Sequence, residues 1–262
     1  MGINEALLLI SLPVIFGSVL LFYSLFGKSG LYAYTVVATL AANIEVLILV
    51  RAFGLEMTLG NVLFASTFLV TDILSETENK AAANRAVWLG LAATMFFLLV
   101  SLSWQWYIPA TGDLISPALK TVFTSTPRMI LSGLAVYAIT QFFDVWVYHR
   151  FWDMTTRWCG QRDRFLWLRN NVGTILSQLI NAVLFNILAF WGIYSGTTLV
   201  NIILSTFLIY VITSLADTPF VYAARRIALE RKKKQEMIKE QEGETNGHKK
   251  QKRTIVKTNE SR

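Results

Sequence analysis

The sequence predicts an all-α protein, a polytopic transmembrane bundle of about seven helices, and three observations support this. First, 54% of its 262 residues are hydrophobic and only 16% are charged, which is more apolar surface than one soluble core of this length buries. Second, apolar runs close to the ~20 residues that cross a hydrocarbon core recur along the chain. Third, the net charge of +7 belongs to the C-terminal end, where residues 225–262 hold 13 of the 24 Lys and Arg but 6 of the 17 Asp and Glu.

Seven segments have roughly the length and hydropathy of a membrane span. The first lacks a basic start and a small-residue cleavage site, which favours a true helix over a signal peptide. The third is the shortest and has polar ends, so a broken or re-entrant piece stays open as an interpretation. The predicted spans are 5–26, 31–53, 59–76, 86–107, 128–149, 170–194 and 197–223.

The loops between these spans differ in their content of Lys and Arg, and cytoplasmic loops retain positive charge. Seven spans place the richer loops on the same side as the basic tail, whereas an even number would not. We therefore expect a multi-pass protein of the bacterial inner (plasma) membrane with an external N-terminus and a cytoplasmic C-terminus. The richer side holds Lys28, Lys80, Arg85, Arg150, Arg157, Arg162, Arg164 and Arg169, and the opposite side holds Arg51, Lys120 and Arg128.

Composition divides the chain into a transmembrane part, residues 1–224, and a basic tail, residues 225–262. The tail should begin as a helical extension and then become disordered, because its apolar content disappears. Contact with anionic lipid headgroups is one role for it, at about 1 kcal/mol for each basic residue near the surface. A solvated tail that only marks the inner side is the interpretation we favour.

The residue content excludes several classes of protein. One cysteine, Cys159, and two histidines allow neither an internal disulfide nor a zinc cluster. Phosphate loops, metalloprotease motifs and serine-hydrolase motifs are missing, as are nucleic-acid recognition modules. We therefore predict no metal, no cofactor, no nucleic-acid partner and no catalytic residues. Asp72 and Glu76, four residues apart, leave intramembrane aspartyl catalysis as a weak alternative.

Aromatic residues gather at the ends of the predicted spans, which is typical of interfacial belts rather than of stacking platforms. They are Trp104, Trp106 and Tyr107 at an outer end, and Trp146, Tyr148, Trp152, Trp158 and Trp167 at an inner one.

Polar and ionisable side chains inside the apolar spans are the strongest functional signal, because a charge at mid-bilayer costs at least ~2.5 kcal/mol and usually faces a cavity or a partner. Helix–helix hydrogen bonds or interfacial solvation are the alternative, favoured for Asp217. Glu45 is as readily structural as proton-carrying, and with Glu76 it is a candidate for coupling. The surroundings of Asp72 and Asp144 are similar enough to suggest an internal repeat, inverted or parallel. The full set is Asn43, Glu45, Asp72, Glu76, Gln141, Asp144, Thr174, Gln178, Asn181, Asn186 and Asp217.

Three ordered blocks resemble the queuosine precursor transporter family, also called the vitamin uptake transporter-like family. They are residues 67–76 (TFLVTDILSE) followed by Lys80 and Arg85, then 141–145 (QFFDV), and then 167–171 (WLRNN) with 177–180 (SQLI). The resemblance covers about residues 35–220, so six spans are family-like and the N-terminal one is additional. Asn79 stands where the family pattern has a glycine, and Asn181 stands where it has an aspartate.

The resemblance implies uptake of a 7-deazaguanine precursor of queuosine, such as the 7-cyano or 7-aminomethyl base or queuine. A carboxylate can accept two hydrogen bonds from the donor edge of such a planar heterocycle, and amides suit its carbonyl. The candidate substrate ligands are Asp72, Asn43, Gln141, Asp144, Gln178 and Asn181.

Other functions stay open. The substrate could be another vitamin-like heterocycle, or the chain could be the substrate-capturing subunit of an energy-coupling complex with a separate ATPase. The driving force is equally open between a proton gradient, facilitated diffusion with trapping, and such an ATPase. A homo-oligomer is compatible with all of these.

Overall fold

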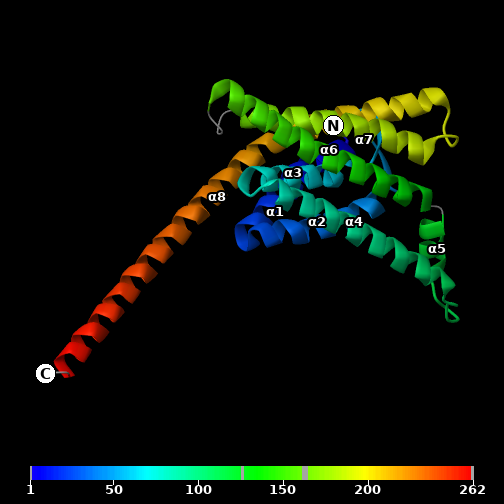
Figure 1. Ribbon diagram of the computed structural model, residues 1–262. Coiled ribbons are helices and arrows are strands. Elements are labelled where there is room, and N and C mark those ends of the chain that lie inside the picture. The colour runs from blue at the N-terminus through cyan, green and yellow to red at the C-terminus, as the bar shows by residue number, and fades with distance from the viewer. Residues whose placement is uncertain (1, 125–126, 161–164, 261–262) are drawn as a thin grey trace.

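The computed structural model describes residues 2–124, 127–160 and 165–260, with the side chains of 239–260 and of a few isolated residues outside that description (Figure 1). The fold is a helical bundle with one small β-hairpin, which confirms the predicted fold class. The elements are α1 (Ile3–Phe26), α2 (Lys28–Glu45), β1 (Leu49–Ala52), β2 (Leu55–Thr58), α3 (Asn61–Thr77), α4 (Lys80–Ser103), a short 3₁₀ turn (Trp104–Trp106), α5 (Ser116–Thr124), α6 (Pro127–Cys159), α7 (Leu166–Phe190) and α8 (Gly196–Glu260).

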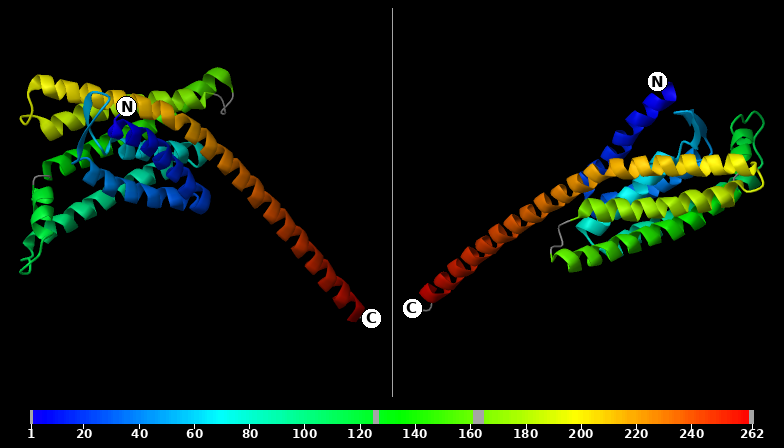
Figure 2. Two further views of the ribbon diagram at one scale, coloured as in Figure 1. Left: turned by 180° about the vertical axis from the view of Figure 1, so that it is seen from behind. Right: turned by 90° about the horizontal axis from the view of Figure 1, so that it is seen from above.

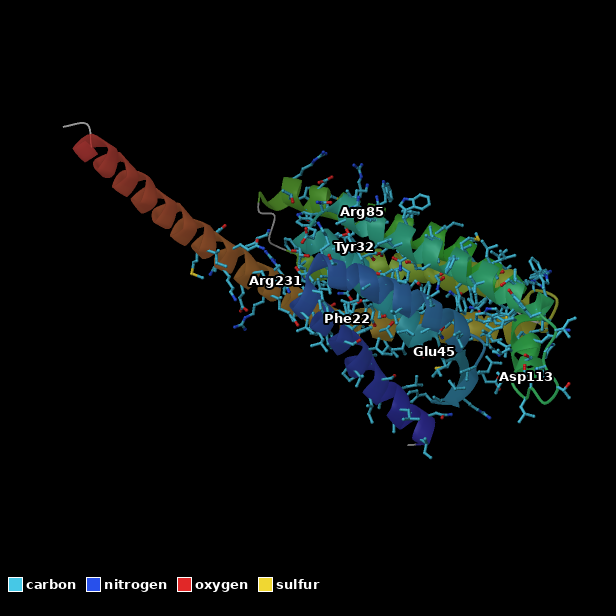
Figure 3. All side chains as sticks on the ribbon, turned by 90° about the horizontal axis from the view of Figure 1, so that it is seen from below. Phe22, Tyr32, Glu45, Arg85, Asp113 and Arg231 are labelled. Atoms are coloured by element: carbon cyan, nitrogen blue, oxygen red, sulfur yellow. The ribbon has the colours of Figure 1, made fainter. Side chains whose placement is uncertain are left out.

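Successive long helices run in alternating directions, which gives the bundle two distinct ends (Figures 1 and 2). At one end, here called the tail end, Lys28 pairs with Glu78 at 3.6 Å and the Arg231 guanidinium lies 5.3 Å from the Tyr23 ring. At the other, the hairpin end, the Asn4 amide donates to the carbonyl of Arg51 at 2.9 Å. Figure 3 shows Arg85 and Arg231 toward the tail end and Glu45 and Asp113 toward the hairpin end.

The predicted partition of basic residues appears in this arrangement. Lys28, Lys80 and Arg85 lie in the first two turns of helices that start at the tail end, and Arg51 and Arg128 belong to elements of the hairpin end. Arg162 and Arg164 lie outside the described residues.

Five helices in the described part of the chain are long and apolar enough to cross a membrane. All five correspond to predicted spans with shifted ends, and α1 keeps most of its apolar surface exposed, as expected for a helix against lipid. The five are Ile3–Phe26, Lys80–Trp106, Arg128–Trp158, Leu166–Phe190 and Gly196–Ile238.

The predicted span 31–53 is wrong in its second half. Helix α2 ends at Glu45, and residues 49–58 form the hairpin β1–β2. Its two-residue turn consists of Phe53 and Gly54, both with positive φ (54° and 75°), the backbone of a type I′ turn that matches the twist of paired strands. A short aliphatic run such as 46–50 cannot be assigned to helix or strand from periodicity alone. The apolar pattern therefore extended the predicted helix into residues that form a strand.

Helix α3 is the central helix of the bundle. It packs against α1, α2, α4, α6 and α8, and every side chain from Ala65 to Ser75 is buried. Because its neighbours rather than lipid surround it, α3 can be short and carry polar groups. This burial explains why the corresponding predicted span, 59–76, is the shortest and has polar ends.

The loop predicted at 150–169 is much shorter in the structure. Helix α6 continues to Cys159 and α7 begins at Leu166, so Arg169 lies in the first turn of α7 rather than in a loop. Its side chain is fully buried.

Helix α8 continues beyond the bundle as one helix whose backbone is described as far as Glu260 (Figures 1 and 2). The backbone of residues 225–260 is helical, in agreement with the high helix propensity of the Lys, Glu and Gln residues there. The predicted disorder of the tail stays a prediction. Helix α8 crosses residue 225 without a break. The predicted division of the chain at this residue stays a prediction.

Candidate functional site

A cavity lies between α2, α3, α4, α6, α7 and α8 toward the hairpin end. It encloses about 590 Å³ of space between atoms, including solvent at its mouth. Its aromatic lining places Phe64 between Tyr137 and Tyr210, with ring centroids 6.0 and 6.4 Å away. Phe185 of α7 adds a fourth ring. A flat ligand would find aromatic surfaces on several sides.

Three asparagines contribute amide groups to the lining: Asn43 from α2, Asn61 from α3 and Asn181 from α7. The Tyr210 hydroxyl links two of them. It accepts from the side-chain amide of Asn181 at 2.9 Å and donates to the side-chain oxygen of Asn61 at 3.4 Å. The Asn43 amide donates to the carbonyl of Thr39 at 2.7 Å. These bonds hold the amide groups in fixed orientations around the cavity.

Two polar groups of the lining have no hydrogen-bond partner among the described residues. They are the Asn61 Nδ2 group and the Tyr137 hydroxyl, both on residues at least nine-tenths buried. A buried donor without a partner costs roughly 1–3 kcal/mol, so such groups in a cavity wall are expected to bind something else. The lining residues are all uncharged. The cavity therefore suits a neutral planar molecule with hydrogen-bonding edges.

A buried polar layer lies next to the cavity on the side of the tail end, and it contains four of the predicted site residues. The Gln141 amide donates to Thr67 at 2.7 Å and its oxygen accepts from Thr71 at 3.2 Å, which joins α6 to α3. Asp72 accepts from the Thr174 hydroxyl at 3.0 Å. Asp144 and Gln178 are buried, and their side-chain polar atoms have no hydrogen bond within the described structure.

A charged cluster closes the bundle beyond this layer. The guanidinium of Arg169 pairs with Glu76, and the two side chains are 0% and 3% exposed. The Tyr148 hydroxyl donates to the same carboxylate at 2.8 Å, and Arg225 of α8 approaches it at 3.5 Å. The Arg169 guanidinium also lies over the Trp152 ring at 4.3 Å. We call Glu76, Tyr148, Trp152, Arg169 and Arg225 the ion-pair cluster.

The predicted site residues therefore fall into four places. Asn43 and Asn181 line the cavity, whereas Asp72, Gln141, Asp144 and Gln178 lie in the polar layer and do not line it. Glu76 belongs to the ion-pair cluster, and Glu45 is half-buried at the last position of α2, near the hairpin. Their individual roles stay predictions.

Sequence reasoning missed most of the cavity wall. Asn61 lies at the start of the short third span, and Phe64, Tyr137 and Tyr210 look like ordinary apolar residues of helices. Tyr148 and Trp152 were expected in an interfacial belt, but they contact a buried arginine, whereas Trp106, Trp158 and Trp167 are exposed as a belt requires.

Comparison with known proteins agrees with this architecture. A family model described as "Putative vitamin uptake transporter" matches residues 58–224, a range that holds the polar layer, the ion-pair cluster except Arg225, and all of the cavity wall except Thr39, Ala42, Asn43 and Val46. A protein of Bacillus subtilis (strain 168) named "Probable queuosine precursor transporter" is 39% identical over 209 residues, which cover 80% of this chain and 89% of the relative. No solved structure matches.

These matches confirm the resemblance read from the sequence blocks, and the apolar helices agree with a multi-pass membrane transporter. The chain belongs to the vitamin uptake transporter family.

Proposed function

We propose that this protein imports a 7-deazaguanine precursor of queuosine across the bacterial inner membrane and that the base binds in the cavity between α2, α3, α4, α6, α7 and α8. The observation that carries the proposal is a cavity with an aromatic lining whose wall holds the unpartnered Asn61 amide and Tyr137 hydroxyl. The name of the Bacillus subtilis relative supports the same substrate class.

The hydrogen-bonding groups of the wall complement such a base. A deazaguanine has a carbonyl acceptor on one edge and ring N–H and exocyclic amine donors beside it. Asn61 Nδ2 and the Tyr137 hydroxyl can donate to the acceptor, while the side-chain oxygens of Asn43 and Asn181 can accept from the donors. The rings around Phe64 can contact the faces of the base, at roughly 1–3 kcal/mol per stacked base in comparable sites.

The uncharged wall favours a neutral base, the 7-cyano compound, over the cationic 7-aminomethyl compound. Asn181 is the position where the family pattern has an aspartate, and an amide there gives the ammonium group no counter-ion. Asn181→Asp should therefore shift competition for uptake toward the aminomethyl base. An unchanged preference would remove Asn181 from the specificity of the site.

The test is queuosine in the tRNA of a bacterium that can neither make nor import the precursor, with and without this gene, fed a nanomolar 7-deazaguanine. Wild-type protein should restore queuosine, and Asn61→Ala should reduce it at equal membrane abundance. Asn201→Ala is the matched control, because Asn201 lies exposed on α8 outside the cavity wall. No queuosine with abundant wild-type protein would contradict the proposed substrate.

We place the tail end in the cytoplasm, because the basic loops and the basic tail share that end. The cavity then lies toward the outside and the ion-pair cluster toward the inside. A reporter active only in the cytoplasm, fused after Arg262, should be active, and the same reporter inserted after Gly112 should not. The reverse pattern would invert the assignment.

Uptake by the purified chain in liposomes would oppose the alternative of a substrate-capturing subunit that depends on a separate ATPase. Transport without a modified product would oppose an intramembrane enzyme. Glu76 is engaged by two arginines, which leaves the Asp72 and Glu76 pair poorly suited to aspartyl catalysis.

A further inference from the structure

We propose that the carboxyls of Asp72 and Asp144 together bind the proton that is co-transported with the base. This inference rests on the proposed transport of a heterocyclic base and adds the site of energy coupling to it. The sequence offered Asp72 and Asp144 as substrate ligands and Glu45 and Glu76 for coupling, and the structure suggests a different division of these roles.

Asp72 on α3 and Asp144 on α6 lie on two helices that pack against each other. Asp72 is 1% exposed and Asp144 is 0% exposed. The Asp144 carboxyl interacts with that of Asp72 and lies near Ser177, and both carboxyls lie against neighbouring residues of α7: Asp72 accepts from the Thr174 hydroxyl at 3.0 Å, and the Asp144 Oδ1 atom lies beside Gly173. Ser177 already donates to the carbonyl of Gly173 at 2.8 Å. Both Asp144 oxygens consequently lack a donor in the described structure.

Two ionised carboxylates are acceptors only, so they cannot bond to each other. A single proton on either carboxyl provides the missing donor and turns the repulsive contact into an O–H···O bond. One bound proton would therefore supply the hydrogen-bond donor that the Asp144 oxygens lack.

The surrounding charged groups do not compensate two ionised carboxylates at Asp72 and Asp144. The acidic groups that act on Asp72 are Asp144, Asp217 and Glu76. Asp217 accepts from the Asn170 amide at 2.8 Å, and Glu76 is bound by Arg169 and Arg225. Four acids thus face two arginines, and an uncompensated buried carboxylate is strongly unfavourable. The remaining charged residues of α1, α2 and α4 lie within two turns of the helix ends: Glu5, Lys28, Glu45, Lys80 and Arg85.

Buried carboxyls of this kind can bind a monovalent cation, and we assign that cation to a proton. A sodium ion needs a shell of several oxygen ligands, whereas a proton needs only one donor oxygen and one acceptor oxygen, and the test distinguishes the two cations.

The position of the pair explains how proton binding could affect the base. Helix α3 carries Asn61 and Phe64 of the cavity wall, and α6 carries Tyr137. Glu76 of the ion-pair cluster lies one turn beyond Asp72 on α3. The protonation state of Asp72 and Asp144 decides whether α3 and α6 repel or bond at this point. A change in the packing of these two helices would therefore reach both the cavity and the ion-pair cluster.

The experiment uses the purified full-length protein in liposomes with the membrane potential clamped to zero. An inward proton gradient of about one pH unit should accumulate a labelled neutral 7-deazaguanine about tenfold if one proton enters with each base. Asp72→Asn and Asp144→Asn should reduce this accumulation to about onefold and still exchange labelled for unlabelled base, because a neutral amide mimics the protonated acid. Asp153→Asn, an exposed carboxyl further along α6, should keep tenfold accumulation.

The outcomes separate this inference from the proposed function. Exchange of base by the wild type without accumulation on a proton gradient would overturn the coupling site and leave the transport function intact. Accumulation on a sodium gradient at equal pH, abolished when choline replaces sodium, would replace the proton by sodium. Tenfold accumulation by the two variants, or loss of their exchange, would overturn the assignment to Asp72 and Asp144. Absence of exchange by the wild type would instead overturn the proposed substrate.

Discussion

The two ends of the bundle bury polar groups in opposite ways. Around the cavity the polar side chains are neutral, and the Asn61 amide and the Tyr137 hydroxyl have no partner among the described residues. In the ion-pair cluster the groups are charged, and Glu76 is bound by Arg169, Tyr148 and Arg225. Satisfied charges hold a protein closed on itself, while unsatisfied donors mark a place for something else. The difference therefore predicts that mutations at one end change stability and at the other change binding.

The largest effect is expected from Arg169→Met, which leaves Glu76 buried with only Arg225 as a charged partner. Removing one member of a buried ion pair costs about 3–5 kcal/mol because the other charge remains uncompensated. The apparent Tm in detergent should fall well below that of the wild type. The double variant Arg169→Met, Glu76→Gln should recover much of the loss. A double variant that is no more stable than the single one would show that packing over Trp152, rather than charge pairing, holds this end.

Tyr148→Phe tests the same cluster with a smaller change. The hydroxyl donates to the Glu76 carboxylate at 2.8 Å, and a hydrogen bond to a charged group contributes about 1.5–3 kcal/mol. Thermal stability should therefore decrease. Affinity for the base, measured by equilibrium binding of labelled ligand below the melting range, should stay within about twofold, because Tyr148 does not line the cavity.

Tyr137→Phe is the matched change at the other end, on the same helix and with the same lost atom. Its hydroxyl has no partner in the described structure without ligand, so stability should stay the same or rise. Affinity should fall about fivefold, as expected for one neutral hydrogen bond of about 1 kcal/mol. Opposite readouts for the two tyrosines would establish the distinction between the ends. A loss of stability with unchanged affinity in Tyr137→Phe would break it.

The sequence predicted those parts of the molecule that depend on contact with lipid. Span length and hydropathy located α1, α4, α6, α7 and α8, and the basic residues identified the tail end. The end of α2 was missed because the aliphatic residues before Arg51 fit a strand as well as a helix. Local pattern could not separate these two structures.

The candidate site was predictable to a lesser extent, because it depends on contacts between distant segments. The intramembrane positions of Asn43, Asp72 and Asn181 marked them as functional candidates, but only the fold shows which of them line the cavity. The burial of Arg169 follows from Glu76, which lies 93 positions earlier in the chain. Phe64 and Tyr210 carry no signal that separates a cavity wall from a packed core.

The smallest effect is expected from Lys28→Ala, which asks whether charge or burial governs the tail end. Lys28 pairs with Glu78 at 3.6 Å, but the two side chains are 45% and 33% exposed. Exposed pairs contribute about 0–1 kcal/mol and are screened by salt, so the apparent Tm should change little, and less at high ionic strength. Affinity should be unchanged. A decrease as large as that of Tyr148→Phe would mean that the whole network of charges holds this end. A negligible decrease would locate its stability in the groups around the buried Glu76 carboxylate, where water cannot replace a lost partner.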